Sequence, residues 1–293
     1  PEGSRRSLAR RGDPSLDAVL DAVLELDRQR REVLVRAEAL KAERNTATEE
    51  VARLKRAKAP ADELMVALKA SGEEVKRLDA RLRAIETALE SQALVIPNFP
   101  SDRIPDGGAT ANRVLRSWGE PPRFDFEPRP HWELGAALGL LDLAAGAKIT
   151  GSGFPLFRGM GARLVRALRE FMLDVHTREH GYEEIVPPYL VNRASLVGTG
   201  QLPKFEEELY HAEADDLFLI PTAEVPVTNV HRDDILDGAS LPVAYTAWTP
   251  CFRREAGAHG KDTRGLIRVH QFDKVELVRF CRPDESDAEH ERM

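Results

Sequence analysis

Residues 251–277 read CFRREAGAHGKDTRGLIRVHQFDKVEL, and this stretch decides the fold of the C-terminal part of the chain. Glycine and polar residues gather at 257–263, and a run of alternating apolar residues follows at 270–278. The pattern predicts a loop that joins two strands. By composition alone, residues 257–263 could be an ordinary hairpin connection as readily as a loop that binds a ligand.

The segments upstream of this stretch continue the same pattern. Short apolar runs lie between turn signals at 182–186, 216–220 and 243–248, and one convincing amphipathic helix covers 160–179. Strands of this length mixed with helices are typical of a mixed domain. We therefore predict an α+β fold with an antiparallel sheet.

The N-terminal part follows a helical pattern, because residues 16–57 contain neither Gly nor Pro and are rich in helix-forming residues. One stripe recurs with the 3.5-residue period of a coiled coil. Its members are Arg30, Val33, Ala37, Leu40, Arg44, Ala47, Val51 and Leu54. A second stripe with the same spacing consists of Leu64, Leu68, Ser71, Val75, Leu78, Leu82, Ile85 and Leu89.

Proline residues mark the limits of the two predicted helices. Pro60 must end the first helix, because proline removes an amide donor and disfavours helical geometry in the preceding residue. A tight turn at 58–62 then makes the helices antiparallel. At roughly 1.5 Å per residue, 35 to 40 residues give an arm on the order of 55 Å long.

Three segments with different patterns follow one another along the chain. We expect a helical arm at 1–97, a linker at 98–110 that is rich in Pro, Gly, Asp and Asn, and a mixed domain at 111–293. The chain begins with Pro1 and stops within a charged, helix-compatible run, so we interpret it as a possible fragment of a longer protein.

Bulk composition excludes several classes of protein. The net charge of -7 argues against a protein that coats nucleic acid indiscriminately, since such binding neutralises many phosphates. Cys251 and Cys281 are too few and too far apart for a disulfide framework or a four-ligand zinc site. No stretch approaches the roughly 18 consecutive apolar residues of a membrane span. We expect a cytoplasmic protein without a membrane partner.

Cations gather at the tip of the arm. Arg53, Lys55, Arg56 and Lys58 precede the turn, whereas acidic residues intersperse most of the shaft. The ordinary interpretation of such a run is a solvated helix face. A cationic tip on a long arm also suits the phosphate backbone of an RNA, or another protein surface.

Three strings in the C-terminal part carry a family resemblance. Residues 251–277 resemble motif 2 of the class II aminoacyl-tRNA synthetases, and TRGLIRVHQFDKVE within them resembles the seryl enzymes. LIPTAEVPVTN at 219–229 is similar to that family's Thr-Ala-Glu serine-binding loop, and GTGQLPKF at 198–205 is also typical of it. The helix at 160–179 with the strand after it resembles motif 1, although an amphipathic core helix would have the same pattern.

The resemblance implies a function and its partners. It implies ATP-dependent activation of L-serine to seryl-adenylate and transfer of the seryl group to the 3′ end of tRNA(Ser), with ATP and Mg²⁺ as cofactors. It also implies a homodimer, because motif 1 packs across a two-fold axis in the family. Residues 1–97 correspond to the tRNA-binding arm and 111–293 to a class II catalytic domain with motifs 1 and 2 only.

The implied chemistry assigns roles to particular side chains. The serine carboxylate must attack the α-phosphate of ATP, and Arg253 supplies the cation that lets two anions approach. The resemblance implies catalytic roles for Arg253 and Glu255, and contacts with serine for Thr222, Glu224 and Glu276. It implies contacts with ATP for Arg253, Arg254, Glu255, Arg268, Val269 and Phe272, and with tRNA for Arg53, Lys55, Arg56, Lys58, Lys261 and Arg264. It assigns no metal ligand.

Simpler interpretations of these residues remain open. Two arginines near a glutamate are ordinarily a surface ion pair, Phe272 could be a core residue, and Thr222 could cap a turn. The family's third motif lies beyond the end of the chain, so we expect this segment alone to have little activity. Alternative functions are a non-catalytic tRNA-binding paralogue, a structural coiled-coil protein, and a class II synthetase for threonine or proline.

Overall fold

A computed structural model describes residues 2–256 and 264–293. The chain divides into two compact units, Pro1–Glu120 and Pro121–Met293. The helical arm and the linker expected at 1–97 and 98–110 both lie within the first unit. No helix of the described residues combines the length and the apolar character that crossing a lipid bilayer requires.

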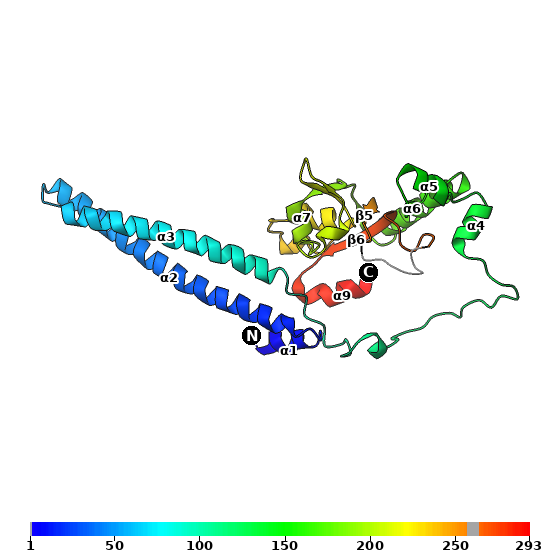
Figure 1. The fold of residues 1–293 in the computed structure, drawn as a ribbon, viewed down its shortest axis with the longest axis horizontal. Helices are drawn as coiled ribbons and strands as arrows, with labels where there is room; N and C mark the ends of the chain where they lie inside the picture. The colour runs from blue at the N-terminus through cyan, green and yellow to red at the C-terminus, as the bar shows by residue number, and fades with distance from the viewer. Residues whose placement is uncertain (1, 257–263) are drawn as a thin grey trace. The chain divides into compact units, whose positions relative to one another are not determined.

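The first unit is a helical hairpin preceded by a short helix. It contains α1 (Glu2–Ala9), α2 (Ser15–Arg56), α3 (Asp62–Ala93) and the 3₁₀ helix η1 (Ala109–Ala111). α2 and α3 lie side by side and antiparallel along most of their length (Figure 1), as predicted. With 42 and 32 residues, the two helices are roughly 63 and 48 Å long at 1.5 Å per residue.

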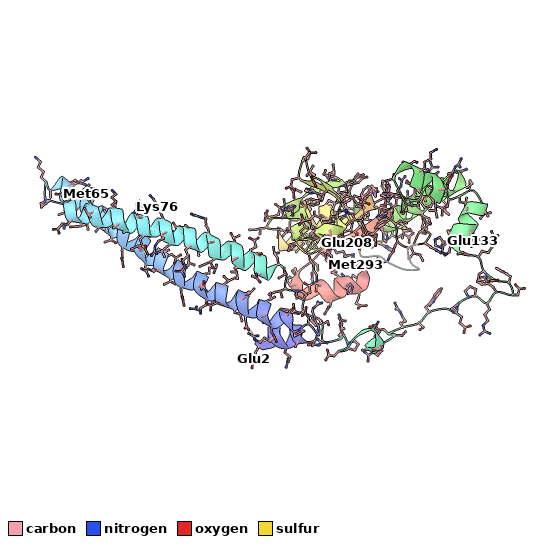
Figure 2. The ribbon with its side chains drawn as sticks, in the orientation of Figure 1. Glu2, Met65, Lys76, Glu133, Glu208 and Met293 are labelled. Atoms are coloured by element: carbon pink, nitrogen blue, oxygen red, sulfur yellow. The ribbon has the colours of Figure 1, made fainter. Side chains whose placement is uncertain are left out.

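The two predicted stripes form the seam of the hairpin. Val33 and Ala37 on α2 pack in one cluster with Leu78 and Ile85 on α3, and Leu40 and Leu82 pack against it. All eight residues of the second stripe are buried or half-buried. Met65 projects near the far end of the hairpin (Figure 2), where its side chain is exposed. The apolar seam therefore holds an otherwise solvated arm together.

Arg10 closes the base of this unit. Its guanidinium donates to the carbonyls of Pro100, Ser101 and Ile104 at 3.3, 3.2 and 2.5 Å, and it pairs with Asp106 Oδ1 at 2.6 Å. The neighbouring Arg11 donates to the carbonyl of residue 98. Because a guanidinium carries five N–H donors in a rigid fork, one side chain can satisfy several carbonyls of an irregular segment. The start of the expected linker is thus bound to the arm.

The second unit combines short helices with two small sheets. Its helices are α4 (His131–Ala137), α5 (Leu143–Ile149), α6 (Met160–Arg178), α7 (Arg193–Gly198), α8 (Glu224–Thr228) and α9 (Ser286–Arg292). Its 3₁₀ helices are η2 (Glu206–Glu208), η3 (Asn229–His231), η4 (Gly238–Ser240) and η6 (Pro283–Glu285). Its strands are β1 (Glu183–Glu184), β2 (Leu190–Asn192), β3 (His211–Ala212), β4 (Leu217–Leu219), β5 (Val243–Phe252) and β6 (Gln271–Phe280).

The sheets confirm the α+β prediction with one difference in detail. β5 pairs with β6 antiparallel, and the second sheet, β2-β4-β3, is antiparallel throughout. β1 is shorter than the strand predicted at 182–186, and it pairs with β5 in parallel. The two strands can be parallel because a long connection, rather than a hairpin turn, joins β1 to β5.

The two faces of the β5–β6 ribbon differ in character. On one face Ala247, Thr249 and Cys251 are fully buried, and their register partners are Glu276, Lys274 and Phe272. On the other face the guanidinium of Arg169, from α6, lies 4.6 Å from the centre of the Trp248 ring. Side chains alternate between the faces of a strand, so every second residue of β6 from Phe272 to Glu276 points to the same side.

Candidate functional site

Three side chains form a hydrogen-bonded group beside the β5–β6 ribbon. Thr222, in the loop between β4 and α8, donates from Oγ1 to Glu276 Oε2 over 2.6 Å. The Lys274 ammonium donates to Thr222 Oγ1 over 2.7 Å and lies 2.5 Å from Glu276 Oε2. The group therefore joins a loop to a strand more than fifty residues away, and it places a carboxylate next to a hydroxyl and a cation.

Arg253 follows the end of β5 and lies against the same loop. Its Nε donates to the carbonyl of Pro221 over 3.3 Å, and its guanidinium lies 5.1 Å from the centre of the Phe272 ring. Arg253 and Thr222 line one cavity of about 440 Å³. The Arg253 side chain is exposed to this cavity, so its charge is available to a ligand.

The backbone beside Arg253 is fixed across the hairpin. The Arg253 amide donates to the carbonyl of His270 over 2.9 Å, and His270 Nδ1 lies 3.0 Å from the carbonyl of Arg253. The His270 ring stacks on Phe154 at 5.1 Å, and a Cβ at Gly153 would lie 2.4 Å from this ring. Only glycine at 153 leaves room for the imidazole, so the support of Arg253 depends on residues about one hundred positions upstream.

A second ion pair lines the other part of the cavity. Arg268 Nη1 lies 3.0 Å from Glu255 Oε2, and the Glu255 side chain is 18% exposed, against 54% for Arg268. Glu255 has a φ of 51°, a left-handed conformation that is uncommon for a residue with a Cβ. Glu208 supports this turn, because its carbonyl accepts from the Arg254 amide and its Oε2 accepts from the Ala256 amide.

The structure brings together five of the nine residues predicted to contact serine or ATP. Thr222, Arg253, Glu255 and Arg268 line the same cavity, and Glu276 reaches it through its bond to Thr222. Phe272 and Val269 line a second, largely apolar cavity of about 340 Å³ that α6 and β6 share. Val269 is buried there, as an ordinary core residue would be.

Other predicted residues lie outside the cavity. The exposed Glu224 contributes its backbone amide, which donates to Thr222 Oγ1 over 3.2 Å. The exposed side chain of Arg254 is not among the described residues that line the cavity. Arg264 is exposed, and Lys261 lies outside the described residues. Arg53, Lys55, Arg56 and Lys58 are exposed at the end of α2, and Arg53 pairs with Glu50 at 2.6 Å.

Two residues with central contacts were missed by the sequence analysis, namely Lys274 and Glu208. Lys274 could have been found from strand periodicity, because it lies two residues from both Phe272 and Glu276 and must share their face. Glu208 lies in a run of three glutamates at η2 (Figure 2), and nothing in its spacing distinguishes it from its neighbours.

The cation and carboxylate pattern of the cavity fits an anionic ligand that also carries an ammonium. Arg253 and Arg268 offer planar donors for phosphate or carboxylate oxygens, and Glu276 offers an acceptor for an ammonium. The described residues contain no cluster of three or more His, Cys, Asp or Glu side chains that could hold a metal ion.

Comparison with known proteins shows which family this chain resembles. Residues 1–100 match the seryl-tRNA synthetase N-terminal domain, and residues 204–293 match the tRNA synthetase class II core domain (G, H, P, S and T). The serine–tRNA ligase of Geobacter sulfurreducens is 52% identical over 287 residues, which cover 98% of this chain and 67% of that protein. The chain belongs to the seryl-tRNA synthetase family.

Further seryl-tRNA synthetases match nearly the whole of this chain. The serine–tRNA ligase of Listeria innocua is 53% identical over 92% of this chain and 63% of its own length. The crystal structure of seryl-tRNA synthetase from Pyrococcus horikoshii complexed with ATP has a TM-score of 0.87 at 33% identity, and the match covers 98% of this chain and 69% of that one. The chain thus spans about two thirds of the length of these seryl-tRNA synthetases.

The thiol of Cys251 gives a test of how the ribbon is buried. Burial raises the pKa of the Cys251 thiol above its ordinary value, and the side chain is fully buried, whereas Cys281 is half-buried. A raised pKa lowers the thiolate fraction at neutral pH, and the thiolate is the nucleophile. We expect iodoacetamide at pH 7.5 to modify Cys281 first in the folded protein and to modify both in denaturant, as peptide mass spectrometry would measure. Equal rates in the folded protein would contradict the burial of Cys251.

Proposed function

We propose that the protein that contains this chain activates L-serine with ATP to form seryl-adenylate and transfers the seryl group to the 3′ end of tRNA(Ser). One observation carries this proposal. The guanidinium of Arg253 faces the same cavity as Thr222, whose hydroxyl is bonded to Glu276. The membership of the seryl-tRNA synthetase family supports the assignment to serine.

Arg253 would bring the two reacting anions together. The serine carboxylate and the ATP α-phosphate repel each other, and a planar guanidinium can donate to both while it stabilises the charge of the transition state. Its Nε bond to Pro221 and its position over Phe272 fix the guanidinium before a ligand arrives. A lysine ammonium, as a point charge, would lack this bidentate geometry.

The ATP would lie on the side of Glu255 and Arg268. Their ion pair orients the guanidinium of Arg268, which could meet the terminal phosphates. Arg253 covers one face of the Phe272 ring, so an adenine that stacks on Phe272 would use the opposite face. Val269 is buried and lines the same apolar cavity as Phe272. Arg254 would contact ATP only after a change of side-chain conformation.

We propose Mg²⁺ as the cofactor that accompanies ATP. When bound, the ion neutralises phosphate charge, and such ions in phosphoryl sites are commonly held by one or two carboxylates and by the phosphates themselves. Glu255 and Glu208 are carboxylates of the described residues that line this cavity, and Glu255 lies beside Arg268. This arrangement fits an ion that arrives with the nucleotide better than one held in a preformed cage.

The arm would bind tRNA(Ser) through the cations at its tip. Arg53, Lys55, Arg56 and Lys58 are exposed there and lie close together in the chain, and Arg53 is paired with Glu50. The shaft cations Lys41 and Arg77 lie far apart in the chain, and both are paired with acidic side chains. A dense group of cations attracts phosphates more strongly than cations that acidic neighbours neutralise. Arg264, and Lys261 outside the described residues, would contact the acceptor end of the tRNA.

We propose that α6 forms a homodimer interface. Met160, Leu164, Leu168 and Phe171 lie on one face of this helix, and their side chains are 46–66% exposed. A contiguous apolar face of this kind marks a contact surface, and two-fold symmetric dimers are the commonest oligomers.

We also propose a cytoplasmic location, which the free thiols of Cys251 and Cys281 support because disulfides are rare in that compartment.

The central test is serine-dependent exchange of pyrophosphate into ATP by the full-length protein. We expect exchange with serine and little with threonine, alanine or glycine. Substitution Arg253→Lys should lower kcat/KM of exchange by about 10²–10³, because one charge-stabilising donor set is lost from the transition state. Absence of exchange with intact tRNA binding would instead favour the non-catalytic tRNA-binding paralogue. Exchange driven equally by alanine would remove the assignment to serine.

The role of the arm is tested by charge removal at its tip. Replacement of Arg53, Lys55, Arg56 and Lys58 by Gln should leave exchange unchanged and raise KM for tRNA in aminoacylation. The slope of log K for tRNA binding against log salt concentration should become shallower by about 0.7–0.9 for each phosphate that the arm no longer neutralises. The matched control replaces Lys76 and Arg77 on the shaft, which pair with Glu73 and Glu74. Equal effects of both variants would assign the arm another function.

The homodimer is tested by the molar mass of the full-length protein in light scattering. We expect twice the chain mass, and a shift to the monomer for Leu164→Glu combined with Leu168→Glu. Arg166→Glu on the opposite side of α6 is the control and should remain dimeric. A monomeric unmodified protein would mean that another part of the same chain covers α6.

A further inference from the structure

The hydroxyl of Thr222 has no hydrogen-bonding capacity left for a substrate. A hydroxyl carries one donor and two acceptor lone pairs. Thr222 Oγ1 donates to Glu276 Oε2, and it accepts from Lys274 Nζ at 2.7 Å and from the Glu224 amide at 3.2 Å. The residue expected from the sequence to contact serine is therefore saturated by its own protein.

Lys274 and Glu276 retain free positions. An ammonium carries three N–H donors, and Lys274 donates one of them to Thr222 Oγ1, while its charge is paired with Glu276 Oε2 at 2.5 Å. Both described contacts of the Glu276 carboxylate involve Oε2, which leaves Oε1 as an acceptor. The side chains of Lys274 and Glu276 are 32% and 21% exposed, so a small ligand can reach them.

The charges of these two groups dictate how an amino acid would lie. Like charges repel, so the α-ammonium of the substrate avoids Lys274 and binds the free oxygen of Glu276. The remaining N–H groups of Lys274 can only donate, and the side-chain hydroxyl of serine supplies an acceptor. The carboxylate of the substrate is then left for Arg253, which lines the adjoining cavity.

We propose that Lys274 is the specificity-determining residue that recognises the serine hydroxyl, with Thr222 serving to orient Lys274 and Glu276. This inference rests on the proposed function and adds to it the group that distinguishes serine from alanine. Alanine lacks the hydroxyl and leaves a charged donor without a partner, which costs binding free energy. Threonine carries the same hydroxyl, so its rejection must come from the space around its methyl group and not from Lys274.

The test measures kcat/KM of pyrophosphate exchange for serine, alanine and threonine in the full-length protein. Lys274→Met keeps the length of the side chain and removes its donors. We expect it to lower the value for serine about 10- to 100-fold, the range for a hydrogen bond to a charged group, while alanine changes little. The serine-to-threonine ratio should stay constant. Lys148→Met, at an exposed position on α5, is the control and should leave all three values unchanged.

Two further variants separate recognition from orientation. Lys274→Arg retains a charged donor, so it should keep more of the preference for serine over alanine than Lys274→Met. Thr222→Val should lower the values for serine and alanine together, since Thr222 acts through its neighbours. The inference is overturned if Lys274→Met lowers serine and alanine equally, or if Thr222→Val changes the serine-to-alanine ratio more than Lys274→Met does. Failure of the unmodified protein to exchange with serine would instead refute the proposed function.

Discussion

The antiparallel register of β5 and β6 determines where Lys274 and Glu276 lie, and its last step holds Arg253. Ten residue pairs, from Val243 with Phe280 to Phe252 with Gln271, fix the ribbon. Successive side chains of a strand point to opposite faces of the sheet. A slip of one residue would therefore turn Lys274 and Glu276 away from Thr222 and turn Asp273 toward it. The ladder continues one step beyond β5 through the Arg253 amide and His270. Main-chain hydrogen bonds therefore fix the backbone positions of Arg253, Lys274 and Glu276.

The site holds its charges in small, mutually supporting groups. Arg268 is paired with Glu255, Lys274 with Glu276, and Arg253 lies over an aromatic ring. Arg268 and Lys274 are thus paired with carboxylates before a ligand binds, which limits the cost of holding positive charges close together. The same pairing orients the donors in advance, and preorganised donors stabilise developing charge with little rearrangement.

The sequence predicted the parts of the fold that depend on local periodicity. The heptads of both arm helices, the proline-limited turn and the long helix of motif 1 lie where their patterns place them. The strings around Thr222, Arg253 and Glu276 correctly marked residues that meet in space. Lys274 and Gly153 were not predicted, since their roles arise from contacts between residues 52 or more positions apart. Such contacts have no periodic signature, and the parallel pairing of β1 escaped prediction for the same reason.

The Arg10 clamp at the base of the arm changes where a mechanical load would act. Residues 98–106 follow the last turn of α3, and three of their carbonyls are bound by one guanidinium from the segment between α1 and α2. A pull transmitted along the chain would be borne by this cross-link and by the packing of Leu8, Leu16 and Leu20, and would not unwind α3 from its end. The bound segment ends at Gly107, where φ is 121°, a conformation that glycine adopts without strain.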